Sequence, residues 1–242
     1  MTLALVHARA QLRQLLRYPA FAIPTLLLPA LFFAFFGLPQ RHTPPNILMA
    51  SFGAYAVLSV AFFQFGVGIA LDRVDPWEAH LRTLPVATRV RFAGRVLSAL
   101  AFALTSAAVV VIVALATTSA SLGPAAWARL ALALLGGSIP LALLGIALGY
   151  WVSPRGALPV ANVLYLGTAY VGGLWTGARN LPRGVEEFGR YLPTRQWGNV
   201  VWSAVGVGDA AVASWLALAG YTIVFGAIAA WGYARDEGER FR

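Results

Sequence analysis

The chain has 242 residues, of which 59% are hydrophobic and only 11% are charged. Soluble domains carry roughly 25% charged residues, so the composition excludes an ordinary water-soluble fold. The formal charge of +9 comes from arginine alone against nine carboxylates, since lysine is absent, and the absence of cysteine excludes disulfides and thiolate metal sites.

Residues 1–18 form the first predicted element. Arg9, Arg13 and Arg17 recur every fourth residue among leucines, so they lie along one face of a helix. This amphipathic pattern predicts a helix in the inner membrane interface, and a solvated helical tail is the alternative.

Six apolar runs are long enough to cross a bilayer, which takes about 20 helical residues. None of them contains Asp, Glu, Arg or His, as expected where an intramembrane charge costs at least about 2.5 kcal/mol on insertion scales. The sequence therefore predicts an all-α integral membrane protein with six transmembrane helices. The predicted spans cover residues 20–38, 47–71, 96–118, 130–152, 157–177 and 210–234.

Arginine placement predicts the orientation, because positively charged short loops stay on the cytoplasmic side. With the N-terminus inside, 12 of the 18 arginines fall in inner segments. We therefore expect both termini to be cytoplasmic. The same distribution, in short segments between apolar runs, argues against nucleic-acid binding.

Residues 72–95, between the second and third predicted spans, are the most charged stretch. Pro76 suits the first turn of a helix that Asp75 can cap, and Pro85 would end that helix. The sequence predicts a short cytoplasmic helix here. Its Glu78 and Arg82 are four residues apart, so they either present both charge signs to a partner groove or pair with each other on a solvated face.

Residues 178–208, between the fifth and sixth predicted spans, are too polar to cross a membrane yet contain several aromatic side chains. Pro182 and Pro193 divide the segment into two short pieces. We expect half-helices that re-enter the outer interface, and a surface loop with an aromatic belt is the alternative.

The chain carries little chemistry of its own. A lysine-containing phosphate loop cannot form, and His7, His42 and His80 lie in three different segments, so we expect no ATP site of that kind, no catalytic residue and no metal site. The predicted spans offer only neutral polar side chains, whereas ion-driven carriers normally keep ionisable groups there.

Three short motifs occur in a recognisable order. Arg17-Tyr18-Pro19 precedes the first span, residues 81–86 read Leu-Arg-Thr-Leu-Pro-Val, and Leu-Pro pairs occur at 181–182 and 192–193. With six spans around them, these motifs resemble the permease subunits of ABC-2 type exporters, the transmembrane subunits of ATP-binding cassette transporters that include daunorubicin and nodulation-factor exporters. The inner loop departs from the family pattern, since it lacks the usual glycine after its acidic residue.

The resemblance implies a half-transporter in a bacterial-type cell membrane. Two permease chains, identical or different, and two ATPase subunits would export a drug, lipid or glycolipid by alternating access, with membrane lipid around them. ATP and Mg would bind to the partner ATPase, and no cofactor to this chain. An ion-coupled secondary transporter and a non-transporting membrane scaffold or assembly protein are the alternatives. Coupling to the ATPase is carried over to Asp72, Asp75, Trp77, Glu78, Leu81, Arg82, Thr83 and Pro85.

The resemblance also implies a substrate path, because relatives face their second and fifth spans across the dimer. An aromatic, nearly uncharged lining would suit a hydrophobic or amphipathic solute, and ordinary helix packing is the alternative role for each aromatic. The implied path residues are Phe62, Phe63, Gln64, Asn162, Tyr165 and Tyr170.

Overall fold

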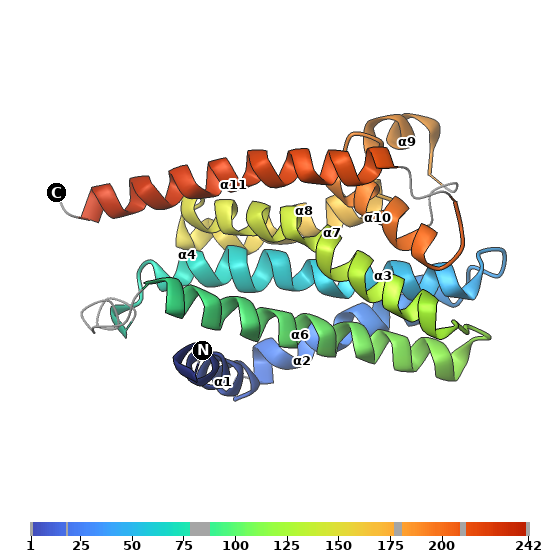
Figure 1. Ribbon diagram of the computed structural model, residues 1–242, viewed down its shortest axis with the longest axis horizontal. Coiled ribbons are helices and arrows are strands. Elements are labelled where there is room, and N and C mark those ends of the chain that lie inside the picture. Colours follow the sequence, from blue (N-terminus) through green and yellow to red (C-terminus); the bar gives the residue numbers. More distant parts are fainter. Residues whose placement is uncertain (1, 18, 78–87, 177–180, 209–211, 241–242) are drawn as a thin grey trace.

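The computed structural model describes residues 2–17, 19–77, 88–176, 181–208 and 212–240, and all regular secondary structure in these ranges is helical (Figure 1). Two π-helical segments, η1 (Phe33–Gly37) and η2 (Ala61–Val67), continue helices α2 and α3. The α-helices are α1 (Thr2–Leu16), α2 (Pro19–Phe32), α3 (Pro45–Val60), α4 (Gly68–Asp72), α6 (Thr88–Thr117), α7 (Pro124–Trp151), α8 (Pro154–Val171), α9 (Arg183–Gly189), α10 (Pro193–Ala204) and α11 (Val212–Arg240).

Four helical stretches within the described ranges are long and apolar enough to cross a membrane: Pro45–Asp72, Val90–Thr117, Pro124–Trp151 and Val212–Glu237. They match the second, third, fourth and sixth predicted spans. The first predicted span is represented by a shorter apolar helix, Ala22–Gly37. The fifth overlaps α8. The protein is therefore a helical membrane protein, and six crossings stay a prediction.

The helix from Pro45 to Asp72, made of α3, η2 and α4, is the centre of the bundle (Figure 1). Almost every residue between Leu48 and Val67 is buried, against α2, α6, α7, α8 and α10. A helix that is apolar on all sides is stable only when other helices or lipid surround it. This one is surrounded mainly by the protein itself.

Glycines let α7 approach this central helix closely. A Cβ atom on Gly145 would lie 2.0 Å from the Ala61 carbonyl oxygen, and one on Gly149 would lie 2.9 Å from that of Gly66. Helices in lipid associate through close packing of small residues. The glycine pair in α7 thus serves contact within the chain.

The segment between α8 and α11 folds into the two short helices α9 and α10, at the end of the bundle away from the C-terminus (Figure 1). Buried indoles anchor α10: Trp197 Nε1 donates to the Ala133 carbonyl at 2.8 Å, and Trp202 Nε1 donates to Ser51 Oγ at 2.7 Å. The two-piece division at Pro193 is as expected, and re-entry into a membrane stays a prediction.

Helix α1 packs against α6, where Ser98 Oγ donates to Gln11 Oε1 at 3.1 Å. It is strongly foreshortened in Figure 1, so its axis runs across the bundle and not along it. Arg9, Arg13 and Arg17 are exposed. The segment is helical as expected, and its location in a membrane interface stays a prediction.

The glycine contact gives a stability prediction. Gly145→Ala should destabilise the protein by about 1–3 kcal/mol, because the added methyl group meets a backbone carbonyl that cannot move freely. Gly167→Ala is the matched control, since nothing lies within 4 Å of its Cβ position. That control should be neutral or stabilising. Unfolding by sodium dodecyl sulfate in mixed micelles measures both, and equal stability of the two variants would contradict the close contact.

Candidate functional site

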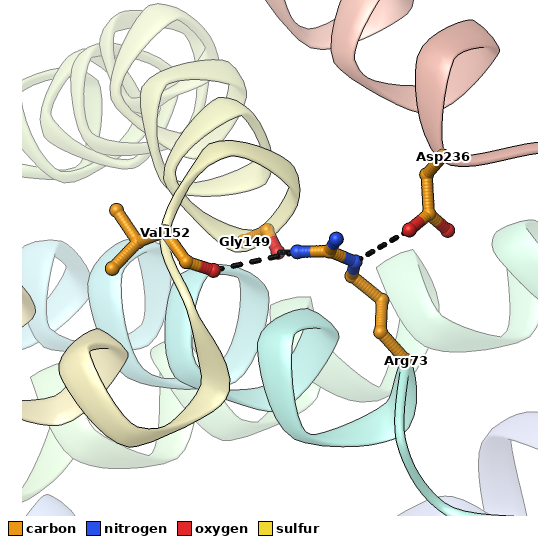
Figure 2. A network of polar contacts seen from close by, with 4 residues as sticks. All are labelled: Arg73, Gly149, Val152 and Asp236. Carbon is orange, nitrogen blue, oxygen red and sulfur yellow. Dashed lines mark hydrogen bonds and ion pairs between the residues drawn. The ribbon is translucent and has the colours of Figure 1, made fainter. Parts of the chain in front are cut away.

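Two adjacent residues of opposite charge, Asp72 and Arg73, end the central helix and bind different helices. Arg73 Nε donates to Asp236 Oδ1 of α11 at 2.7 Å. Its Nη1 donates to the carbonyls of Gly149 and Val152, at the end of α7, at 3.2 and 3.3 Å (Figure 2). We call Arg73, Asp236 and these two carbonyls the arginine joint.

The joint has a clear physical basis. The last carbonyls of a helix have no partner inside that helix, and the negative end of the helix dipole favours a cation there. Arg73 supplies that cation to α7, and Asp236 balances its charge. Both side chains are largely buried, at 20% and 7% exposure. A buried carboxylate without such a partner would be strongly destabilising.

Asp72 makes a second ion pair, with Arg95 of α6. These two residues stand at the two ends of the charged segment 72–95. Their contact therefore brings the two ends of that segment together. The arginine joint, next to Asp72, also connects the start of the segment to α7 and α11.

The first turn of the expected coupling helix is partly described. Asp75 Oδ1 accepts a hydrogen bond from the Trp77 backbone N–H at 2.9 Å, which is the N-cap geometry that the sequence predicts. Trp77 is exposed. Five expected coupling residues, Glu78, Leu81, Arg82, Thr83 and Pro85, lie outside the described residues, and coupling by this segment stays a prediction.

Two of the expected path residues meet in an aromatic cluster. Tyr165 of α8 stacks on Tyr55 of α3 with ring centroids 4.5 Å apart, and Phe63 meets Tyr165 edge-on at 5.4 Å. The Tyr165 hydroxyl donates to the Tyr55 carbonyl at 3.3 Å. Trp175 continues the cluster from Tyr55 towards the exposed Phe36.

One other expected path residue, Tyr170, reaches the edge of the cluster at Trp175. Phe62 is fully buried, and Asn162 Nδ2 donates to the Leu158 carbonyl of its own helix. Gln64 is 8% exposed, and its Nε2 atom has no hydrogen-bond partner among the described residues. It lies in η2, and π-helical turns occur frequently at functional sites. A role in transport stays a prediction for all six residues.

The sequence analysis missed Arg73, Arg95 and Asp236 as interacting residues, and Tyr55 and Trp175 as members of the aromatic cluster. A signal for the first three was present, because charges of both signs directly flank uncharged spans. No comparable signal marked the aromatics.

A bundle of long apolar helices, joined at one end by buried ion pairs, defines the class as a helical membrane protein. One similar protein comes from Bacillus subtilis (strain 168) and bears the name "Putative transport permease YvfS". It is 23% identical over 222 residues, which cover 89% of this chain and 91% of that protein. No protein-family model and no solved structure matches the chain. The similarity runs along almost the whole of both chains and supports a transport permease located in a membrane.

The arginine joint gives a second stability prediction. Asp236→Asn should destabilise the protein by roughly 1–3 kcal/mol, because the Arg73 guanidinium loses its buried counter-charge. Glu186→Gln is the control: Glu186 pairs with Arg190 at 3.7 Å on the surface of α9, and its loss should cost at most about 0.5 kcal/mol. Denaturation in mixed micelles compares the two. A larger effect of the surface variant would show that the joint contributes little.

Proposed function

We propose that this chain is the transmembrane permease subunit of an ATP-dependent ABC-2 type exporter. It moves a hydrophobic or amphipathic solute out of the cytoplasm, and separate ATPase subunits supply the energy. The similarity to a protein named as a transport permease supports the transport role. The absence of charge from the predicted spans and of any lysine-containing phosphate loop supports an external energy source.

The observation that carries the proposal is the attachment of the segment 72–95 to three long helices. Asp72 pairs with Arg95 of α6, and Arg73 joins α7 and α11. In the proposed mechanism, an ATPase subunit displaces the cytoplasmic helix of this segment. The displacement would reach α6, α7 and α11 through these ion pairs.

The proposed solute class rests on the aromatic cluster. Tyr55 and Tyr165 are buried between the central helix and α8, the half-buried Phe63 lies against Tyr165, and none of the three is ionised, so an opening between these helices would present aromatic rings. Such a surface favours a solute with a large apolar area and few charges. Two permease chains would enclose the path, each contributing the same cluster if the chains are identical.

Coupling is tested at Leu81, whose apolar side chain we assign to the ATPase contact. Leu81→Arg should abolish most solute-stimulated ATP hydrolysis of the complex in vesicles, because a charge replaces an apolar contact with the partner. Glu78→Ala should weaken the stimulation less. The measurement is phosphate release with and without solute.

Gly184→Arg is the control for the new arginine. Gly184 is exposed at the far end of the bundle, and nothing lies within 4 Å of its Cβ position. This variant should retain full stimulation. If no ATP-hydrolysing subunit co-purifies with the wild-type chain, the protein is a membrane scaffold or an ion-coupled carrier and the proposal fails.

The orientation is tested by cysteine labelling, for which the cysteine-free chain is well suited. Arg41→Cys and Arg183→Cys place thiols at exposed positions that we assign to the outside, and Arg155→Cys places one at an exposed position that we assign to the cytoplasm. An impermeant thiol reagent added to intact cells should label the first two only. Labelling of Arg155→Cys alone would reverse the orientation.

A further inference from the structure

Helix α1 turns a row of arginines away from the bundle. Its other side contacts α6, where Gln11 Oε1 accepts a hydrogen bond from Ser98 Oγ at 3.1 Å, and Leu12 packs against the buried core. The row consists of Arg9, Arg13 and Arg17, which are exposed and spaced four residues apart. Arg13 is two residues from Gln11 and therefore about 200° away around the helix. The arginines thus lie on the side opposite to α6, and we call this side the outer face of α1.

The charges of the outer face have no counter-charge in the part of the chain that the structure describes. The side chains of Arg9, Arg13 and Arg17 make no ion pair and no hydrogen bond there. Arg73 and Arg95 differ from them, because each is paired with an aspartate. A row of unpaired cations on one face attracts anions from outside the chain.

The contact with Ser98 indicates the depth of α1 along the bundle. Ser98 is three residues after Arg95, which pairs with Asp72 at the end of the central helix. Such a charged pair lies outside the hydrocarbon, because charge inside a bilayer is costly. At 1.5 Å per residue, Ser98 lies about 5 Å from this charged level, towards the middle of the bundle. Since α1 runs across the bundle (Figure 1), its whole length stays near the level at which hydrocarbon meets lipid headgroups.

Apolar side chains on the same outer face favour lipid as the partner. Leu5, four residues before Arg9, is 55% exposed, and Val6, seven residues before Arg13, is 65% exposed. Both spacings keep them on the side of the arginines. In water such exposed apolar groups gain nothing, whereas at a membrane interface they enter the acyl region. The long arginine side chains can then extend several ångströms to the phosphates.

We propose that the outer face of α1 binds the phosphates of acidic phospholipids in the leaflet at this end of the bundle. Arg9, Arg13 and Arg17 bind phosphate oxygens through their paired N–H groups, and Leu5 and Val6 contact the acyl chains. Successive arginines are about 6 Å apart along the helix, so the row can hold neighbouring headgroups. This site depends on the membrane location and not on the transport function, so either proposal can fail without the other.

The test is native mass spectrometry of the full-length protein, purified in dodecyl maltoside with any subunits that accompany it, during titration with phosphatidylglycerol or phosphatidylcholine. Wild-type protein should bind phosphatidylglycerol in preference to phosphatidylcholine. Arg13→Gln alone should weaken phosphatidylglycerol binding about fivefold, the contribution of one arginine near an anionic lipid surface. Arg9→Gln, Arg13→Gln and Arg17→Gln together should weaken it by at least about tenfold. Lysine at the same three positions keeps the charge and should bind more tightly than glutamine.

The matched control removes three exposed arginines outside α1, through Arg41→Gln, Arg155→Gln and Arg183→Gln together. The net charge falls by the same amount, yet phosphatidylglycerol binding should change by less than about twofold, because these positions do not belong to the row. Glutamine has nearly the helix propensity of arginine, so both triple variants should unfold in mixed micelles like the wild-type protein.

Four results would overturn the site. Equal loss of binding in the two triple glutamine variants would mean general attraction of anions. Lysine at positions 9, 13 and 17 binding no better than glutamine would show that the charge does not matter. Displacement of phosphatidylglycerol by inorganic phosphate at matched concentration would mean a site for a free anion. Loss of an accompanying subunit with unchanged lipid binding would mean that the outer face of α1 contacts a protein.

Discussion

The cost of placing a charge in hydrocarbon constrains every part of this structure. The predicted spans contain no ionised side chain, so charge is confined to the helix ends, where it can also hold helices together. Arg73 is such a charge at a helix end. Its guanidinium neutralises Asp236 of α11 and donates to the carbonyls of Gly149 and Val152 at the end of α7, so it joins these two helices to the central helix. Asp72 and Arg95 add a second contact one residue away. Ion pairs with largely buried side chains therefore join the long helices at one end of the bundle, and neutral groups join them along its length.

Those neutral contacts follow from the same constraint. Lipid tails are as apolar as leucine, so burial of apolar surface gives helices in a membrane little reason to associate. In this bundle, close backbone approach and hydrogen bonds between helices provide the driving force for association instead. Gly145 and Gly149 bring backbones into contact, and Trp197 and Trp202 donate indole N–H groups to α7 and α3. The central helix can consequently be apolar on every side and still occupy one fixed position.

The sequence predicts well what depends on local pattern. Four of the predicted spans coincide with long apolar helices, and the Asp75 cap follows from its spacing to Pro76. The sequence does not predict which side chains pair between distant segments. Arg73 and Asp236 are 163 positions apart, and a charge at the end of a span does not indicate which other charge it contacts. For the same reason, the sequence identified only some members of the aromatic cluster. Hydropathy identified Phe63 and Tyr165 as residues of two spans, but only the helix arrangement brings Tyr55 and Trp175 to them.

One side chain serving two helices has a kinetic consequence. Arg73 reaches Asp236 and the end of α7 with different nitrogens of the same planar group, so a single rotamer change withdraws both bonds at once. A rotamer change of Asp236, in contrast, withdraws only the bond to α11 and leaves the end of α7 capped. The joint can therefore open in two ways: Arg73 releases both helices in one step, and Asp236 releases α11 alone.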